Sequence, residues 1–255
     1  MELDVAIQRF MREEHISDTR LISSVDDIRY AATKAYHDLM LRTITGHTSI
    51  VQENCVSWLA VQIKKFIENQ FASEDDYTNK HKTLCNDFLA ELNRELEKSG
   101  AKQQSFGKAQ KAVNMAMKYL YCFRDRDSYK NLFAFAHMPL DTNTLNWYYS
   151  NSSKDWKEKH TWSNLSADEY YNKIVGEIPD IIEKTPEYEG IALPSSPLEA
   201  DFIIWAGEKR KAALKELKNI LKKSGKNSDL IQSITPEDKK EMREYFEQIM
   251  QDRAE

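Results

Sequence analysis

The stretch that decides the fold lies at residues 105–123 and reads SFGKAQKAVNMAMKYLYCF, and residues 136–147 then read AHMPLDTNTLNW. The first run is apolar around much of a helical circumference, which predicts a central helix over residues 107–123. In the second run Asp141 follows a Pro-Leu pair, where a carboxylate can cap the free N–H groups of a new helix. The two runs therefore place the amine of Lys111 and the carboxylate of Asp141 near two helix starts.

The residues before this stretch predict four helices. Apolar positions recur at helical spacing over residues 3–14, 25–43, 49–71 and 73–99. Thr48 or Ser49 can cap the third helix, Ser73 followed by three acids can cap the fourth, and Ser99-Gly100 ends it. We expect these four helices to form one bundle-like layer.

The residues after Trp147 continue this helical pattern. Ser166 begins a helix-start signature, and Pro179 is expected to kink or interrupt the helix that follows. Residues 186–197, PEYEGIALPSSP, hold three prolines and one glycine and predict a loop at a subdomain seam or beside an active site. A long helix to about Lys223, basic on its exposed side, and a last helix from Thr235 complete the chain.

Composition indicates an all-α protein. Only 7 glycines and 6 prolines occur in 255 residues, and 41% hydrophobic residues suffice for a packed core. We expect a single domain over residues 1–255 with two helical lobes, one of residues 1–100 plus the C-terminal helices and one of residues 101–190 that holds the site. No apolar run is long enough for a membrane span and the first residues carry acids, so we expect a cytoplasmic protein without a membrane partner.

Three widely spaced cysteines fall inside helical patterns. Cys55, Cys85 and Cys122 are expected to be buried thiols, and we expect no metal site and no cofactor. The net charge of -5 argues against general nucleic-acid binding, although residues 99–124 hold five basic residues and no acid.

Four polar residues of the central helix, Lys108, Lys111, Asn114 and Lys118, fall on one stripe. A solvent-exposed stripe is the commoner interpretation of such a pattern, because charged residues are mostly exposed. A functional interpretation needs a second observation.

That second observation is a resemblance. Gly107, Gln110-Lys111-Ala112-Val113 and Met117-Lys118, followed by Pro139-Leu140-Asp141-Thr142 before a helix, resemble the catalytic half of the helix-hairpin-helix DNA glycosylases. Within them the match is most similar to the archaeal 8-oxoguanine glycosylase branch. It covers about 45 residues (roughly 105–147), and the 30-residue separation of Lys111 and Asp141 is similar to that of this branch. The resemblance implies a helical, two-lobed, glycosylase-like fold.

The resemblance also implies a function and a set of residues. Lys111 would be the catalytic nucleophile, with Lys108 as the fallback because Ser105 and Ala109 depart from the common hairpin, and Asp141 would be its catalytic partner. DNA repair by excision of a damaged or modified purine, with strand cleavage through a Schiff base, would be the activity, and duplex DNA with a flipped base the partner. The implied substrate-binding residues are Gly107, Lys108, Gln110, Lys118, His137 and Trp147, while Trp58, Trp162 and Trp205 are unranked candidates for a base-stacking wall.

Two other interpretations stay open. One is a helical binding or interaction protein, such as a ligand sponge or a defence component, which the negative charge favours. The other is a hydrolase that uses His37-Asp38 as a metal pair, although the remaining histidines do not supply the expected ligands.

Overall fold

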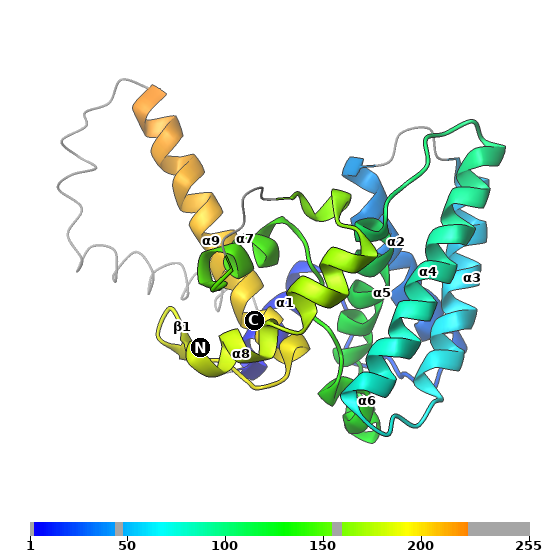
Figure 1. The fold of residues 1–255 in the computed structure, drawn as a ribbon, viewed down its shortest axis with the longest axis horizontal. Coiled ribbons are helices and arrows are strands. Elements are labelled where there is room, and N and C mark those ends of the chain that lie inside the picture. Colours follow the sequence, from blue (N-terminus) through cyan, green and yellow to red (C-terminus); the bar gives the residue numbers. More distant parts are fainter. Residues whose placement is uncertain (1–2, 44–47, 155–159, 224–255) are drawn as a thin grey trace. The chain divides into compact units, whose positions relative to one another are not determined.

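The computed structural model describes residues 3–43, 48–154 and 160–223 (Figure 1). The chain divides into two compact units, Met1–Glu208 and Lys209–Glu255. All described buried hydrophobic residues belong to the first unit, as do all the candidate site residues. The predicted last helix from Thr235 lies outside the described residues.

Four helices of the first unit form a bundle. Helices α2 (Val25–Thr43), α3 (Ser49–Ile67), α4 (Glu74–Lys98) and α5 (Phe106–Tyr121) pack in a closed order, in which α5 contacts both α2 and α4 and α3 contacts the same two helices (Figure 1). The sequence predicted a layer that included the N-terminal helix of residues 3–14, whereas in the structure α5 takes this place in the bundle. The mostly apolar surface of α5 explains the difference, since only burial among other helices covers it.

The helix limits follow local signals that the sequence carries. The Thr48 side chain accepts a hydrogen bond from the Val51 N–H, and the Ser73 side chain accepts one from the Asp76 N–H. Helix α4 ends before Ser99, and Gly100 adopts a φ of 70°, which glycine accepts without steric cost. The predicted limits of α2 and α4 are confirmed, while α3 ends at Ile67 rather than Phe71.

Helix α1 (Leu3–Glu13) packs outside the bundle. The ring of Phe10 contacts those of Tyr119, Phe202 and Trp205, at centroid distances of 5.5, 5.3 and 5.3 Å. Helix α1 therefore joins α5 to the first part of α9 (Pro197–Lys223).

The segment between α5 and α9 consists of short elements. They are the 3-10 helix η1 (Arg126–Tyr129), α6 (Lys130–Ala134), α7 (Thr142–Asn151), the 3-10 helix η2 (Trp162–Asn164), the π-helix η3 (Glu169–Val175), α8 (Ile178–Lys184) and the hairpin of β1 (Glu187–Tyr188) and β2 (Ile191–Ala192). Ser166 caps as predicted, exchanging hydrogen bonds with Glu169. Of the two predicted outcomes, the structure shows an interruption: η3 ends at Val175, α8 begins at Ile178, and Pro179 lies in the first turn of α8, where its missing N–H costs nothing.

The predicted loop at residues 186–197 contains this two-stranded hairpin. Glu187 pairs with Ala192 and Tyr188 with Ile191, and Glu189 and Gly190 take φ values of 52° and 76° in the turn. The described part of the chain is otherwise helical or irregular, so the all-α prediction is confirmed at this level. None of its helices combines the length and apolar character that a membrane crossing requires.

Candidate functional site

Helix α5 is buried at every position except Lys111. Of the predicted polar stripe, Lys108 is 7% exposed, Asn114 0% and Lys118 1%. The solvent-exposed interpretation is therefore wrong for these three residues, because α5 lies inside the bundle rather than on its surface. Lys111 is the one position at which this central helix reaches toward solvent.

The Lys111 side chain lies against an aromatic ring. Its Nζ is 4.5 Å from the centroid of Trp162, in η2, which is a cation–π distance. No described carboxylate forms an ion pair with this amine. The Lys111 amine therefore lies against the face of the Trp162 ring and is not paired with any described carboxylate.

A pair of hydrogen bonds fixes the backbone next to Lys111 against the backbone next to Asp141. The buried Gln110 side chain donates from Nε2 to the Leu140 carbonyl at 2.9 Å and accepts from the Leu140 N–H at 3.3 Å. Asn114 holds this amide by donating to Gln110 Oε1 at 3.1 Å. Gln110 therefore acts as a positioning residue. Its side chain is fully buried, which does not match the predicted role in substrate contact.

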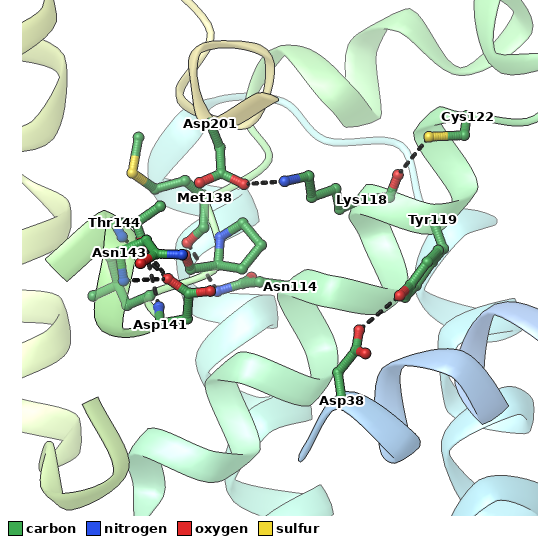
Figure 2. A network of polar contacts seen from close by, with 12 residues as sticks. Asp38, Asn114, Lys118, Tyr119, Cys122, Met138, Asp141, Asn143, Thr144 and Asp201 are labelled. Carbon is green, nitrogen blue, oxygen red and sulfur yellow. Dashed lines mark hydrogen bonds and ion pairs between the residues drawn. The ribbon is translucent and has the colours of Figure 1, made fainter. Parts of the chain in front are cut away.

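Asp141 caps α7 as predicted (Figure 2). Its Oδ1 accepts hydrogen bonds from the N–H groups of Asn143 and Thr144 at 2.7 and 3.1 Å, and the Thr144 hydroxyl accepts from the Asp141 N–H. The Oδ2 atom accepts no hydrogen bond from any described residue. One carboxylate oxygen thus stabilises the helix, and the other takes no part in the cap. Lys111 and Asp141 themselves form no ion pair.

The start of α5 packs tightly against η2. The Gly107 N–H donates to the Leu165 carbonyl at 2.9 Å, and a Cβ at position 107 would lie 1.8 Å from the Trp162 carbonyl oxygen. The predicted substrate contact of Gly107 cannot use its backbone N–H, because Leu165 already accepts from that donor. Gly107 instead allows the close approach that brings Trp162 to Lys111.

Lys108 lies in the first turn of α5 and donates to the Gln104 side chain. Burial lowers the pKa of Lys108, and the charge of the exposed Lys102 lowers it further. Lys108 is almost completely buried, whereas Lys111, one turn later in the same helix, is partly exposed.

Lys118 forms a buried ion pair with Asp201 of α9 at 2.7 Å (Figure 2). The rings of Phe10, Phe202 and Trp205 surround its ammonium at 4.4, 4.7 and 4.9 Å. Burial raises the pKa of Asp201 against the opposing effect of Lys118, and the nearby charge of Asp141 contributes to the rise. The predicted substrate contact of Lys118 is therefore replaced by a structural role.

His137 belongs to a buried hydrogen-bond network. Its Nε2 and Nδ1 hydrogen-bond with the hydroxyls of Thr78 and Tyr170 at 3.1 and 3.2 Å, and Asn114 connects Tyr170 to His81. Burial lowers the pKa of His137 well below its ordinary value, and His81 contributes to the decrease. His137 is consequently neutral, with both ring nitrogens engaged, which does not match a predicted substrate contact.

Two cavities lie beside this region. One of about 100 Å³ is lined partly by His137 and Pro179, and one of about 370 Å³ is lined partly by Tyr121 and Arg126. Neither is lined by Lys111 or Asp141. Trp147 is 1% exposed in the core, so the aromatic residue at the site is Trp162, which the sequence left unranked.

A second carboxylate lies on the other side of α5. Asp38 of α2 accepts a hydrogen bond on Oδ2 from the Tyr119 hydroxyl at 2.7 Å (Figure 2). Burial raises the pKa of Asp38, and the hydrogen bond from Tyr119 opposes the rise. The sequence drew attention to Asp38 only as half of a metal pair and did not reveal its hydrogen bond with Tyr119, because no local signal predicts the packing of α2 on α5.

The His37-Asp38 metal interpretation gains no support from the geometry. His37 Nε2 hydrogen-bonds with Gln52 at 2.7 Å, while Asp38 faces Tyr119. Within residues 3–43, 48–154 and 160–223 no three His, Cys, Asp or Glu side chains gather as metal ligands would. The cysteines are buried free thiols, as predicted.

Comparison of the chain with protein-family models, with curated proteins and with solved structures finds no match in any of the three.

Proposed function

We propose that this protein is a DNA glycosylase with lyase activity, of helix-hairpin-helix glycosylase-like fold, that removes a damaged or modified purine such as 8-oxoguanine. The observation that carries the proposal is the single break in the burial of α5. Every residue of this helix is buried except the amine-bearing Lys111. The Gln110–Leu140 hydrogen bonds hold the Asp141 helix start against the same turn.

Lys111 meets the requirements of a nucleophile better than the other two lysines of α5. Lys118 is buried in an ion pair, and Lys108 is buried against Gln104. Lys111 is partly exposed and has no carboxylate partner among the described residues. The ring of Trp162, 8% exposed, fixes the position of the Lys111 amine at the edge of the helix.

The reaction uses the electron pair of the neutral Lys111 amine. A bond forms from Nζ to the sugar carbon C1′ while the bond from C1′ to the base breaks, and its electron pair leaves with the base. The base takes up the proton that the attached nitrogen releases. As the sugar ring opens, the remaining nitrogen proton passes to the ring oxygen and the imine forms. Water then removes a C2′ proton, and the C3′–O bond breaks with its electron pair leaving on the 3′-phosphate.

Asp141 supplies charge stabilisation in this scheme. Its free Oδ2 is a fixed negative charge that can face the positive charge developing on the sugar as the base departs. The cap through Oδ1 holds the carboxylate still, so little reorganisation is needed during the reaction.

Borohydride trapping tests the proposal, because it reduces the imine to a stable amine and joins protein to DNA. A duplex that contains 8-oxoguanine is expected to give a covalent adduct with the protein, and Lys111→Gln is expected to abolish it. Lys108→Gln is the matched control from the same helix and should retain the adduct. Absence of any adduct with several damaged purines, together with non-covalent binding of another ligand, would favour the binding-protein interpretation.

A further inference from the structure

A chain of hydrogen bonds runs through the core from α4 to the backbone just before Asp141. His81 Nε2 lies 2.8 Å from Asn114 Oδ1, and Asn114 Nδ2 donates to Gln110 Oε1 at 3.1 Å. Gln110 in turn binds both the N–H and the carbonyl of Leu140. His81, Asn114 and Gln110 are each 0% exposed, so bulk water does not compete for these groups.

The surroundings of Asn114 fix the direction of this chain. Its Nδ2 lies 3.1 Å from Gln110 Oε1, 3.4 Å from the Met138 carbonyl and 2.8 Å from the Tyr170 hydroxyl. The reversed amide would turn Oδ1 toward the oxygens of Gln110 and Met138, which have no proton to donate. Asn114 Oδ1 is therefore an acceptor, and His81 Nε2 must carry the proton.

The second ring nitrogen of His81 agrees with this tautomer. Its Nδ1 lies 2.8 Å from the Tyr171 hydroxyl, which can donate to it. Burial lowers the pKa of His81 to about 4, although the hydrogen bond with Asn114 opposes the decrease, so the ring is neutral at pH 7 and carries one proton. With that proton on Nε2, each side chain of the chain donates toward Leu140.

Loss of the Nε2–H would leave a buried acceptor without a donor. Asn114 Oδ1 has no other hydrogen-bond partner among the described residues. Because an unsatisfied buried acceptor is costly, the Asn114 amide would turn to find a donor and would release Gln110. Gln110 would then hold Leu140 less firmly, and the Asp141 helix start would shift relative to Lys111.

Resting on the proposed function, we propose that His81 is a positioning residue that holds the Asp141 carboxylate in place beside the turn of Lys111. It acts through its Nε2–H, which orders the amides of Asn114 and Gln110. His81 touches neither the sugar nor the attacking amine, and no bond to it forms or breaks in the reaction.

Two substitutions of His81 separate this role from packing. His81→Phe keeps a ring and removes the donor, whereas His81→Gln removes the ring and keeps a donor, since the amide nitrogen of glutamine can take the place of Nε2. Tyr77→Phe is the control from the same helix. The Tyr77 ring stacks on that of His81 at 5.9 Å, and its buried hydroxyl has no partner among the described residues.

The first measurement needs no substrate. NMR of the ¹⁵N-labelled parent protein gives the tautomer of His81, and we expect the proton on Nε2. This measurement tests the proposal without any substitution, and so it holds even where a variant does not fold.

Hydrogen exchange of the Leu140 N–H then reports how firmly this backbone is held. We expect exchange at Leu140 to be about tenfold or more faster in His81→Phe, and within about threefold of the parent protein in Tyr77→Phe. His81→Gln should also stay within about threefold of the parent protein, because it keeps the donor. The Ile16 N–H, which donates to the Met11 carbonyl at 2.8 Å outside this chain, corrects for changes in global stability.

The second measurement is the single-turnover rate of borohydride trapping on the 8-oxoguanine duplex. We expect His81→Phe to slow trapping by about tenfold to 10²-fold, because a small misplacement of a reacting group is enough for such a loss. His81→Gln and Tyr77→Phe should stay within about threefold of the parent protein, and all variants should bind the duplex equally.

The outcomes separate the two claims. A proton on Nδ1 of His81, or exchange and trapping in His81→Phe like those of the parent protein, would overturn the role of His81 and leave the glycosylase proposal standing. Equal losses in His81→Phe and His81→Gln would also overturn it, because they would show that the packing of the ring matters. A parent protein that traps no damaged duplex would overturn the glycosylase proposal, while the tautomer and the exchange at Leu140 would still decide whether His81 orders this backbone.

Discussion

Asp141 uses its two carboxylate oxygens differently, and this makes its roles separable. The Oδ1 atom accepts the N–H groups of Asn143 and Thr144 at the start of α7, while Oδ2 is open. An asparagine in this place keeps an acceptor for the cap and loses the charge, whereas an alanine loses both. The two substitutions therefore distinguish helix stabilisation from charge stabilisation.

For Asp141→Asn we expect unchanged stability and a trapping rate lower by about 10²-fold to 10³-fold, because only the charge that acts in the transition state is removed. Asp141→Ala should show the same loss of rate and a free energy of unfolding lower by about 0.5 to 2 kcal/mol, from loss of the cap. Urea unfolding and single-turnover trapping measure the two effects. A normal rate for Asp141→Asn would leave Asp141 with a capping role alone.

At the level of elements, one buried ion pair joins α5 to α9, beside the hydrogen bond that Tyr121 donates to Glu199. Lys118 and Asp201 are each 1% exposed, and Asp201 Oδ1 has no hydrogen-bond partner among the described residues. The aromatic rings of Phe10, Phe202 and Trp205 exclude water around the ammonium. Such a pair contributes little net stability while intact, but loss of one partner leaves a buried charge unpaired.

Asp201→Ala is therefore expected to lower the free energy of unfolding by about 3 to 5 kcal/mol. The double variant Lys118→Met with Asp201→Leu removes both charges and should recover most of this loss. Urea unfolding of the three proteins tests the expectation. Equal instability of the single and double variants would show that packing, and not the stranded charge, dominates.

The end of α7 is joined to the end of η3 by a second carboxylate, Glu177. Its oxygens accept hydrogen bonds from the hydroxyls of Tyr148, Ser152 and Ser153, and Lys154 pairs with it at 3.2 Å. Burial raises the pKa of Glu177, but these hydrogen bonds and the ion pair outweigh burial and lower the pKa to about 2. Because the folded state favours the ionised carboxyl, Glu177 stabilises the protein above its ordinary pKa of 4.5, and this stability is lost as the pH falls toward 2.

We accordingly expect Glu177→Gln to destabilise the protein at pH 7 and to do so less and less as the pH falls below 4.5. Unfolding by urea at pH 7, 4.5 and 3 gives the difference between variant and parent at each pH. Glu187→Gln, which changes an exposed glutamate of β1, is the control and should show a small difference at each pH. A constant difference for Glu177→Gln would contradict a pKa lowered by these partners.

At the scale of the first unit, Met1–Glu208, the fold surrounds one helix and leaves it open at one residue. The bundle covers α5 with α2 and α4, η2 packs against its start, and Asp201 of α9 pairs with it near its end. The uncovered position carries Lys111, next to Gln110, which holds the Asp141 helix start through Leu140. Lys111 is therefore the residue of α5 on which the proposed reaction is centred.

Much of this fold could be predicted from the sequence, because helix limits depend on neighbouring residues. Ser73 and Asp141 cap helices through side chains three residues or fewer from their partners, and such signals are visible in the chain. The effect of Pro179 was harder to predict, because whether a proline kinks one helix or begins another depends on the packing around it.

The site could be predicted only in part, because its contacts join distant residues. The helical pattern of α5 places Lys111 and Lys118 on the same stripe and so predicts the same surroundings for both. The ion pair of Lys118 with Asp201, 83 residues later, could not be predicted from this pattern. Trp162 reaches Lys111 through the packing of η2 against the start of α5, for which no local signal exists. The amphipathic pattern of α5 could not reveal that its polar stripe is buried.

The most direct test of the central claim is to locate the covalent bond. After borohydride trapping on the 8-oxoguanine duplex, the adduct is digested with nuclease and protease, and mass spectrometry identifies the modified residue. We expect the sugar remnant on the Nζ atom of Lys111, in the peptide around residues 109–118, and on no other lysine. A remnant on Lys108, on Lys118 or on any residue outside α5 would contradict the account.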